Sequence, residues 1–308
     1  MWTQAGVTVL GAATIRVTAV IHSRSKACLA YDVAVGERRT LIGGHGLPLG
    51  YAEYGRADGP PVLLQHGLFG SAELGEVWAD RAERAGIRLV AVERPGYSGS
   101  APAQMRSVAD WAGIVDPLLE LLGAPVDVVG ISAGAPYTYA LAALRPERVR
   151  AGWLLSGLPY VYDDAVRGHY PDASQRAWEF FGTGEPEQVG SYFAGEHDRF
   201  VAAFAEHPPT QRALAANLAT GYAGPAREAR LQVRPWGFTP ADVLRPITAW
   251  HSRGDDQVPF DAVEDTIALV PGGRLLEQVE PGHLPSTGTL DALFDALADP
   301  DRDPVATP

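Results

Sequence analysis

The stretch that decides the fold is residues 126–144, which read VDVVGISAGAPYTYALAAL. Residues 126–129 follow a short, mostly apolar strand pattern, and residues 135–144 follow a helical pattern. Between them stands a G-x-S-x-G motif with Ser132 at its centre. A strand that turns sharply into a helix at such a serine is a nucleophile elbow, and the glycines avoid side-chain collisions there. The stretch therefore predicts that Ser132 lies accessible above one edge of a β-sheet.

A second stretch is suited to supporting that serine. Residues 61–71 read PVLLQHGLFGS, an apolar strand that ends in His-Gly and a loop of small residues. A serine that attacks a carbonyl group needs backbone N–H donors aimed at the developing oxyanion. In this architecture one donor follows the nucleophile, here Ala133, and the other comes from the loop after an earlier strand. We expect Leu68 to be that second donor, with Phe69 as the alternative, and we interpret His66 as a structural brace.

Two later strand ends carry an acid and a base. Residues 247–259 read ITAWHSRGDDQVP, and residues 275–285 read LLEQVEPGHLP. A serine nucleophile needs an imidazole base and a carboxylate that orients it, and either Asp255 or Asp256 satisfies the second requirement. His283 is the last histidine of the chain. A solvated acidic turn or an exposed loop histidine would explain each pattern alone. Their order along the chain is Ser, Asp, His, which is the order found in proteins whose serine nucleophile lies in such an elbow. Together the residues therefore predict a catalytic triad.

Taken together, these motifs make the sequence resemble the α/β-hydrolase family from about residue 36 to residue 298. The motifs that carry the resemblance are HG at 66–67, ERPGYSGS at 93–100, GISAG at 130–134, RPWGF at 234–238, WH at 250–251, Asp255 with VP at 258–259, and GH at 282–283. The resemblance implies an α/β fold, a mostly parallel sheet flanked by helices. In the family's acid motif the aspartate stands four residues before the proline of Val-Pro, which favours Asp255. The RPWGF motif resembles the corresponding segment of a bacterial subgroup of α/β-fold hydrolases that carry a helical cap.

The sequence departs from the family pattern at three positions. Glu93 stands where the family usually has aspartate, and Ser98 and Ser252 stand where it usually has glycine. These positions affect the packing at strand ends and the turn before the acid. None of them belongs to the predicted triad, so the resemblance still supports catalysis. It says little about the substrate, because this fold hosts many chemistries.

Periodicity along the chain indicates four segments. Residues 1–35 match nothing in the hydrolase pattern and are expected to be an N-terminal extension. Strand and helix patterns alternate over residues 36–157 and 244–298, as in a parallel sheet covered on both faces. Residues 158–243 follow helical patterns and predict an inserted α-helical cap above the sheet edge that bears Ser132. Residues 299–308 are rich in aspartate and proline and are expected to form a flexible tail.

The predicted cap is rich in aromatic residues. One interpretation is an apolar substrate pocket, in which convergent polar groups meet an aromatic lining. The alternative, which is the better one for any single residue, is that these side chains pack the helices of the cap. The residues proposed for the pocket are Phe69, Tyr160, Trp178, Phe181 and Trp236.

Composition excludes several classes of function. The formal net charge of −12 argues against binding to nucleic acid or to an anionic membrane surface. The sequence has no phosphate-binding glycine motif and no cluster with metal-ligand spacing, so we expect no cofactor and no metal. Cys28 is the only cysteine, which excludes an intrachain disulfide and agrees with a reducing compartment. No apolar run reaches the length of a membrane span, and the N-terminus is a poor secretory signal, so a cytoplasmic location is expected.

The sequence thus predicts a serine hydrolase that cleaves a small carboxylic ester, lactone or thioester through an acyl-enzyme on Ser132. Its partner is expected to be a small molecule with an apolar acyl or alcohol part. The same residues can also serve carbon–carbon bond hydrolysis, perhydrolysis or acyl transfer to an alcohol. A third hypothesis is a non-enzymatic ligand-binding protein with this fold. The oligomeric state does not follow from the sequence.

Overall fold

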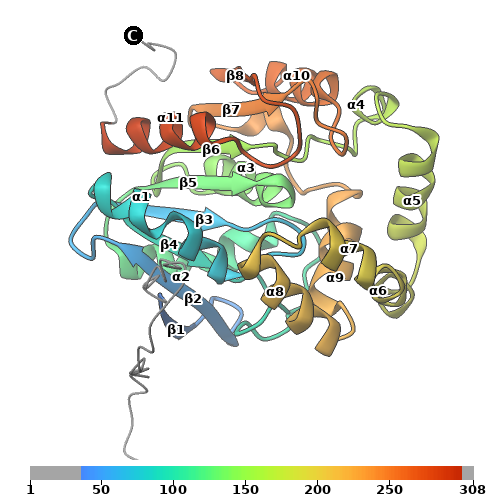
Figure 1. Cartoon of the computed structure of the whole chain (residues 1–308), viewed down its shortest axis with the longest axis horizontal. Coiled ribbons are helices and arrows are strands. Elements are labelled where there is room, and N and C mark those ends of the chain that lie inside the picture. Colours follow the sequence, from blue (N-terminus) through green and yellow to red (C-terminus); the bar gives the residue numbers. More distant parts are fainter. Residues whose placement is uncertain (1–35, 300–308) are drawn as a thin grey trace, which may run out of the picture. The chain divides into compact units, whose positions relative to one another are not determined.

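The computed structural model describes residues 36–299 and contains one eight-stranded sheet with the order β1-β2-β4-β3-β5-β6-β7-β8 (Figure 1). The predicted N-terminal extension with Cys28, and all of the predicted tail except Asp299, lie outside the described residues. The strands are β1 (Glu37–Ile42), β2 (Pro48–Gly55), β3 (Pro61–Gln65), β4 (Arg88–Val92), β5 (Val126–Ile131), β6 (Val149–Leu155), β7 (Ile247–Ser252) and β8 (Gly273–Gln278).

The sheet is mostly parallel. Strands β3 to β8 run parallel to one another, whereas β2 pairs antiparallel with both β1 and β4. Parallel strands need long crossover connections, which the alternating helices provide. The predicted mostly parallel sheet with flanking helices is therefore confirmed. Because parallel neighbours end at the same edge, the loops that follow β3, β5, β7 and β8 all gather there.

Side chains alternate across each strand, so the sheet buries two apolar faces. Leu63 of β3 faces one core, which also contains residues of α2 (Asp110–Leu122), α3 (Ala135–Leu144) and α10 (Phe260–Ala268). Its neighbours Val62 and Leu64 face the other core, which is covered by α1 (Ala79–Arg84) and α11 (Thr287–Ala298). Both faces of β3 and β5 are fully buried, and this holds the strand ends that carry the candidate site in place.

The helical segment over residues 72–84 is divided in two. Its first half is the 3-10 helix η1 (Ala72–Trp78), and only the second half is α1. Gly75 lies in η1, where an added Cβ would come 2.3 Å from the ring of Tyr54. Glycine is a weak helix former. Close packing on the first antiparallel hairpin therefore takes precedence over regular helix geometry here.

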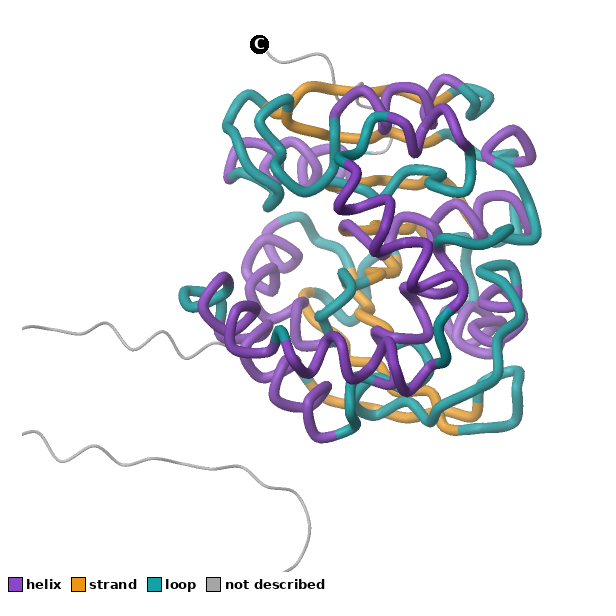
Figure 2. Tube along the Cα trace, turned by 90° about the vertical axis from the view of Figure 1, so that its right-hand side faces the viewer, coloured by secondary structure: helices purple, strands orange, loops and turns teal. Residues whose placement is uncertain are grey.

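Six helices and one 3-10 helix lie between β6 and β7, within the limits 158–243 that the sequence assigned to a cap. They are α4 (Asp164–Gly168), α5 (Asp172–Thr183), α6 (Pro186–Gly195), α7 (His197–Ala203), α8 (Pro208–Ala219), α9 (Ala223–Gln232) and η3 (Pro240–Asp242). Helices α5 to α9 lie beyond one end of the central strands (Figure 1), and Figure 2 views them from that side. Side chains of α5, α6, α8 and α9 share a small apolar core of their own, together with Tyr222.

Candidate active site

The turn after β5 has the backbone of a nucleophile elbow. Ser132 has a φ of 49°, a left-handed conformation that is uncommon for a residue with a side chain. A Cβ on Gly130 would lie 2.4 Å from the hydroxyl oxygen of Thr138. A Cβ on Gly134 would lie 2.3 Å from the carbonyl oxygen of Gln65. Both positions thus require glycine, because neighbouring residues lie where a Cβ atom would stand. The strained turn presents Ser132 at the edge of the sheet.

The three residues predicted as a triad form one hydrogen-bonded chain. Nε2 of His283 lies 2.9 Å from Oγ of Ser132, and Nδ1 of His283 lies 2.8 Å from Oδ2 of Asp255. In this arrangement the serine hydroxyl donates to Nε2 and the Nδ1–H donates to the carboxylate. The serine follows β5, the aspartate follows β7 and the histidine follows β8. This geometry can transfer a proton from the serine to the imidazole while the carboxylate orients the ring.

The carboxylate of Asp255 is held from several sides. The backbone N–H groups of Gln257 and Val258 donate to its Oδ1 at 2.8 and 3.0 Å, and its side chain is fully buried. Burial alone would raise the pKa of Asp255, but the His283 hydrogen bond and these N–H groups together hold its pKa below the usual range. Its neighbour Asp256 is exposed. Between the two acids that the sequence left open, only Asp255 reaches the imidazole.

A second histidine contacts the same carboxylate. His251, at the end of β7, is completely buried, and its Nε2–H donates to the carbonyl oxygen of Val258 at 2.8 Å. The same nitrogen lies 3.4 Å from Oδ2 of Asp255. Burial lowers the pKa of His251, which keeps this imidazole neutral. The sequence patterns assign no catalytic role to His251, although its place at a strand end, four residues before the acid, is a usable clue.

The loop after β3 runs beside the serine. A Cβ placed on Gly67 would lie 3.7 Å from the Cβ of Ser132, an ordinary van der Waals distance, so this loop lies within contact range of the serine. The hydroxyl of Tyr97 donates to the carbonyl oxygen of Leu68 at 2.8 Å. The side-chain amide of Gln232 donates to the carbonyl oxygen of Ala133 at 2.9 Å. The residues predicted to supply the oxyanion donors are therefore both anchored through their carbonyl groups, next to Ser132.

His66 is built into the support of this loop. Its side chain is buried, its Nδ1 lies 2.7 Å from the carbonyl oxygen of Gly67, and its ring packs edge-on against Tyr97. Burial and the charge of Arg94 lower the pKa of His66 well below its usual range. A neutral, enclosed imidazole fits the bracing role that the sequence predicted.

A buried ion pair, which no motif in the sequence predicts, lies behind the loop. Nη2 of Arg94 donates to Oε2 of Glu228 at 2.9 Å, and its Nε donates to Oε1. Both side chains are almost completely buried, although 134 residues separate them. Burial raises the pKa of Glu228, against the attraction of Arg94. The pair joins the turn after β4 to helix α9 of the cap.

Removing one partner of this pair should destabilise the protein strongly. We expect Glu228→Ala to lower the free energy of unfolding by about 3–5 kcal/mol, because Arg94 would keep a buried charge without compensation. Urea denaturation measures this change. The matched control is Glu196→Ala, which breaks an ion pair with Arg199, a side chain that is 79% exposed, and should cost less than about 1 kcal/mol. Equal losses in the two variants would contradict the expectation.

Most of the residues proposed for the pocket pack in the interior, as the alternative interpretation of the sequence expected. Trp236 is fully buried against Tyr160, and its indole N–H donates to the carbonyl oxygen of Gln232. Phe181 belongs to the core of the cap, and the ring of Phe69 packs against Phe193 and Phe200 of the same core. These side chains join cap to core because burying aromatic surface is the main stabilisation available to a small cap.

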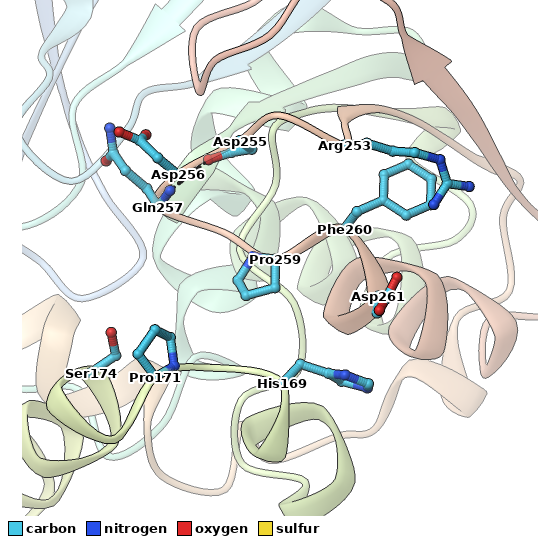
Figure 3. A pocket seen from close by; sticks show the side chains of 10 residues that line it. All are labelled: His169, Pro171, Ser174, Arg253, Asp255, Asp256, Gln257, Pro259, Phe260 and Asp261. Carbon is cyan, nitrogen blue, oxygen red and sulfur yellow. Dashed lines mark hydrogen bonds between the residues drawn. The ribbon is translucent and has the colours of Figure 1, made fainter.

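Trp178, the fifth residue of the proposed pocket, lines a cavity of about 350 Å³ within the cap. A second cavity, of about 430 Å³, lies between the β7–α10 turn and the α4–α5 segment (Figure 3). Its lining residues are His169, Pro171, Ser174, Arg253, Asp255, Asp256, Gln257, Pro259, Phe260 and Asp261. Neither lining includes Ser132 or His283, so we assign neither cavity to the reacting group of a substrate.

Among residues 36–299, no group of three or more histidine, cysteine, aspartate and glutamate side chains is arranged to hold a metal ion. In the same part of the chain, no helix has the length and the apolar character that crossing a bilayer requires.

Comparison with known proteins identifies the family. The model of the alpha/beta hydrolase family matches residues 62–296. The chain belongs to the alpha/beta hydrolase family. The predicted fold class is thereby confirmed.

Individual relatives in this family are distant. The chain is 35% identical over 107 residues to the "Putative carbamate hydrolase RutD" of Variovorax paradoxus, a match over 33% of this chain and 40% of that protein. It is 28% identical over 169 residues to the "Putative non-heme haloperoxidase" of Mycobacterium phage D29, over 53% of this chain and 59% of that protein. The chain thus matches only about half the length of these relatives.

Among solved structures, an esterase from Exiguobacterium antarcticum has a TM-score of 0.64 and 19% identity. The match covers 84% of this chain and 97% of that one. At this level of identity the likeness concerns the fold.

Proposed function

We propose that the protein is a serine hydrolase that cleaves a small carboxylic ester, lactone or thioester through an acyl-enzyme on Ser132. The observation that carries the proposal is the continuous hydrogen-bonded chain from Ser132 through His283 to Asp255. The positive φ of Ser132 supports it, because strained backbone conformations cluster at functional sites.

In the proposed reaction, Oγ of Ser132 attacks the carbonyl carbon of the substrate while its proton passes to Nε2 of His283. Asp255 stabilises the imidazolium that forms. The N–H groups of Leu68 and Ala133 hold the oxyanion, and the leaving alcohol or thiol takes the proton from Nε2. Water then attacks the acyl group, gives its proton to His283, and releases the acid as Ser132 regains its hydrogen.

A fluorophosphonate probe tests whether Ser132 is an activated nucleophile. We expect stoichiometric labelling at Ser132, located by mass spectrometry of the adduct peptide, because a hydroxyl activated by an imidazole attacks phosphorus readily. Heat-denatured protein is the control and should not react. A panel of p-nitrophenyl esters, lactones and thioesters then identifies the class of substrate. Folded protein that stays unlabelled and leaves the whole panel intact would favour the ligand-binding hypothesis instead.

A further inference from the structure

Helix α9 of the cap contacts both loops that flank Ser132. Glu228 and Gln232 stand four residues apart on this helix and therefore share one of its faces. Both side chains are buried, with exposed fractions of 2% and 4%. One faces the turn that supports the loop after β3, and the other faces the elbow after β5.

The contact with the elbow is direct. The side-chain amide of Gln232 donates a hydrogen bond of 2.9 Å to the carbonyl oxygen of Ala133, the residue proposed to supply an oxyanion donor. The position of Gln232 is itself fixed, because the indole N–H of Trp236 donates to its carbonyl oxygen. Leaving a buried carbonyl oxygen without a hydrogen-bond donor costs free energy. This bond therefore holds the peptide group that follows Ala133 in one orientation.

The contact with the other loop passes through the turn after β4. Glu228 binds Arg94, whose Nη2 lies 3.1 Å from Nδ1 of His66, and Arg227 donates to the carbonyl oxygen of Pro95. The same turn carries Tyr97, whose hydroxyl donates to the carbonyl oxygen of Leu68.

We propose that helix α9 positions the oxyanion hole, with Gln232 and Glu228 as its positioning residues. This inference rests on the proposed function. The helix holds the loops of Leu68 and Ala133 at a fixed distance from each other, and catalysis by paired N–H donors requires that geometry before the substrate arrives. This part of the cap therefore belongs to the catalytic framework. It does not act as a lid, because lifting α9 would separate the buried charges of Arg94 and Glu228.

The test is Gln232→Met, which keeps the length of the side chain and removes the donor. Its matched control is Gln175→Met in helix α5, where the same kind of bond, also 2.9 Å, joins a glutamine amide to the carbonyl oxygen of Tyr170. We expect Gln232→Met to lower kcat by about tenfold to hundredfold and to leave KM within about twofold, because misplaced donors weaken the transition state more than the bound ester. Gln175→Met should keep the wild-type kcat.

A tetrahedral inhibitor supplies a second readout. A trifluoromethyl ketone that adds to Ser132 should bind Gln232→Met more weakly by the same factor as the loss in kcat, because its adduct also places an oxyanion between the two donors. Loss of stability alone would not produce this proportionality. Gln232→Leu, which also removes the N–H donor and replaces the amide with an apolar side chain, provides the same comparison if the methionine variant does not fold.

Three results would overturn the proposal. They are a kcat for Gln232→Met within twofold of the wild type, an equal loss of kcat in Gln175→Met, or inhibitor binding that does not follow kcat. A wild-type protein that neither reacts with the fluorophosphonate nor cleaves any ester would overturn the proposed function as well. An active wild type with an unaffected Gln232→Met would overturn only the role of α9.

Discussion

Replacing Ser132 with alanine should lower kcat for ester hydrolysis by about 10⁴- to 10⁶-fold, because the acyl-enzyme can no longer form. The residual rate would come from substrate binding and the oxyanion donors alone. Burst and steady-state release of p-nitrophenol from a short-chain ester measures the change. The variant should also lose all fluorophosphonate labelling. Retention of activity within tenfold of the wild type would remove Ser132 from the mechanism.

The chain offers a closely matched control for this variant. Ser156 directly follows the neighbouring parallel strand β6, and its φ of 47° is almost the same as the 49° of Ser132. It is buried, and its backbone N–H donates to the carbonyl oxygen of Trp250. Ser156→Ala removes a hydroxyl from an equally strained strand end, so we expect kcat within about threefold of the wild type. Similar losses in the two variants would indicate damage to the sheet edge rather than to catalysis.

The parts of the site that could be predicted are those that local sequence determines. Ser132 lies in a five-residue motif in which both glycine positions are needed for close packing. His283 lies in a short loop that follows a strand. Each prediction needed only the end of one strand. Parallel pairing then brings those ends to the same edge of the sheet. The long-range geometry of Ser132, His283 and Asp255 thus follows from local patterns and one rule of topology.

Residues that act through distant partners could not be predicted. Arg94 and Glu228 are far apart in sequence, and a single charged residue in a helical pattern is normally interpreted as exposed. Gln232 carries no chemical pattern of its own. Their roles depend on how the cap docks, which periodicity does not specify. The same reason left the role of Trp236 open, since aromatic residues suit a pocket lining and a packed junction equally well.

The choice between Asp255 and Asp256 carries the second large effect. We expect Asp255→Asn to lower kcat by about 10⁴-fold, because an amide cannot stabilise the imidazolium and favours the wrong tautomer of His283. The low pKa of Asp255 means that the wild-type carboxylate is ionised throughout the neutral range. It also means that folding gains stability from this carboxylate above its unfolded-state pKa, and that the gain is lost as pH falls through the lower pKa of the folded state. Asparagine lacks this acid-dependent contribution.

Asp256→Asn makes the same chemical change one residue further on, at an exposed side chain, and should leave kcat within about threefold of the wild type. Steady-state kinetics of both variants at pH 7 to 8, with thermal unfolding as a check on folding, separates the two positions. A large loss only in Asp256→Asn would transfer the acid role to the neighbouring residue. Equal large losses would mean that the turn after β7, rather than one carboxylate, is what His283 requires. The expected outcome is a loss confined to Asp255→Asn, because the backbone N–H groups of Gln257 and Val258 hold the carboxylate of Asp255 in place.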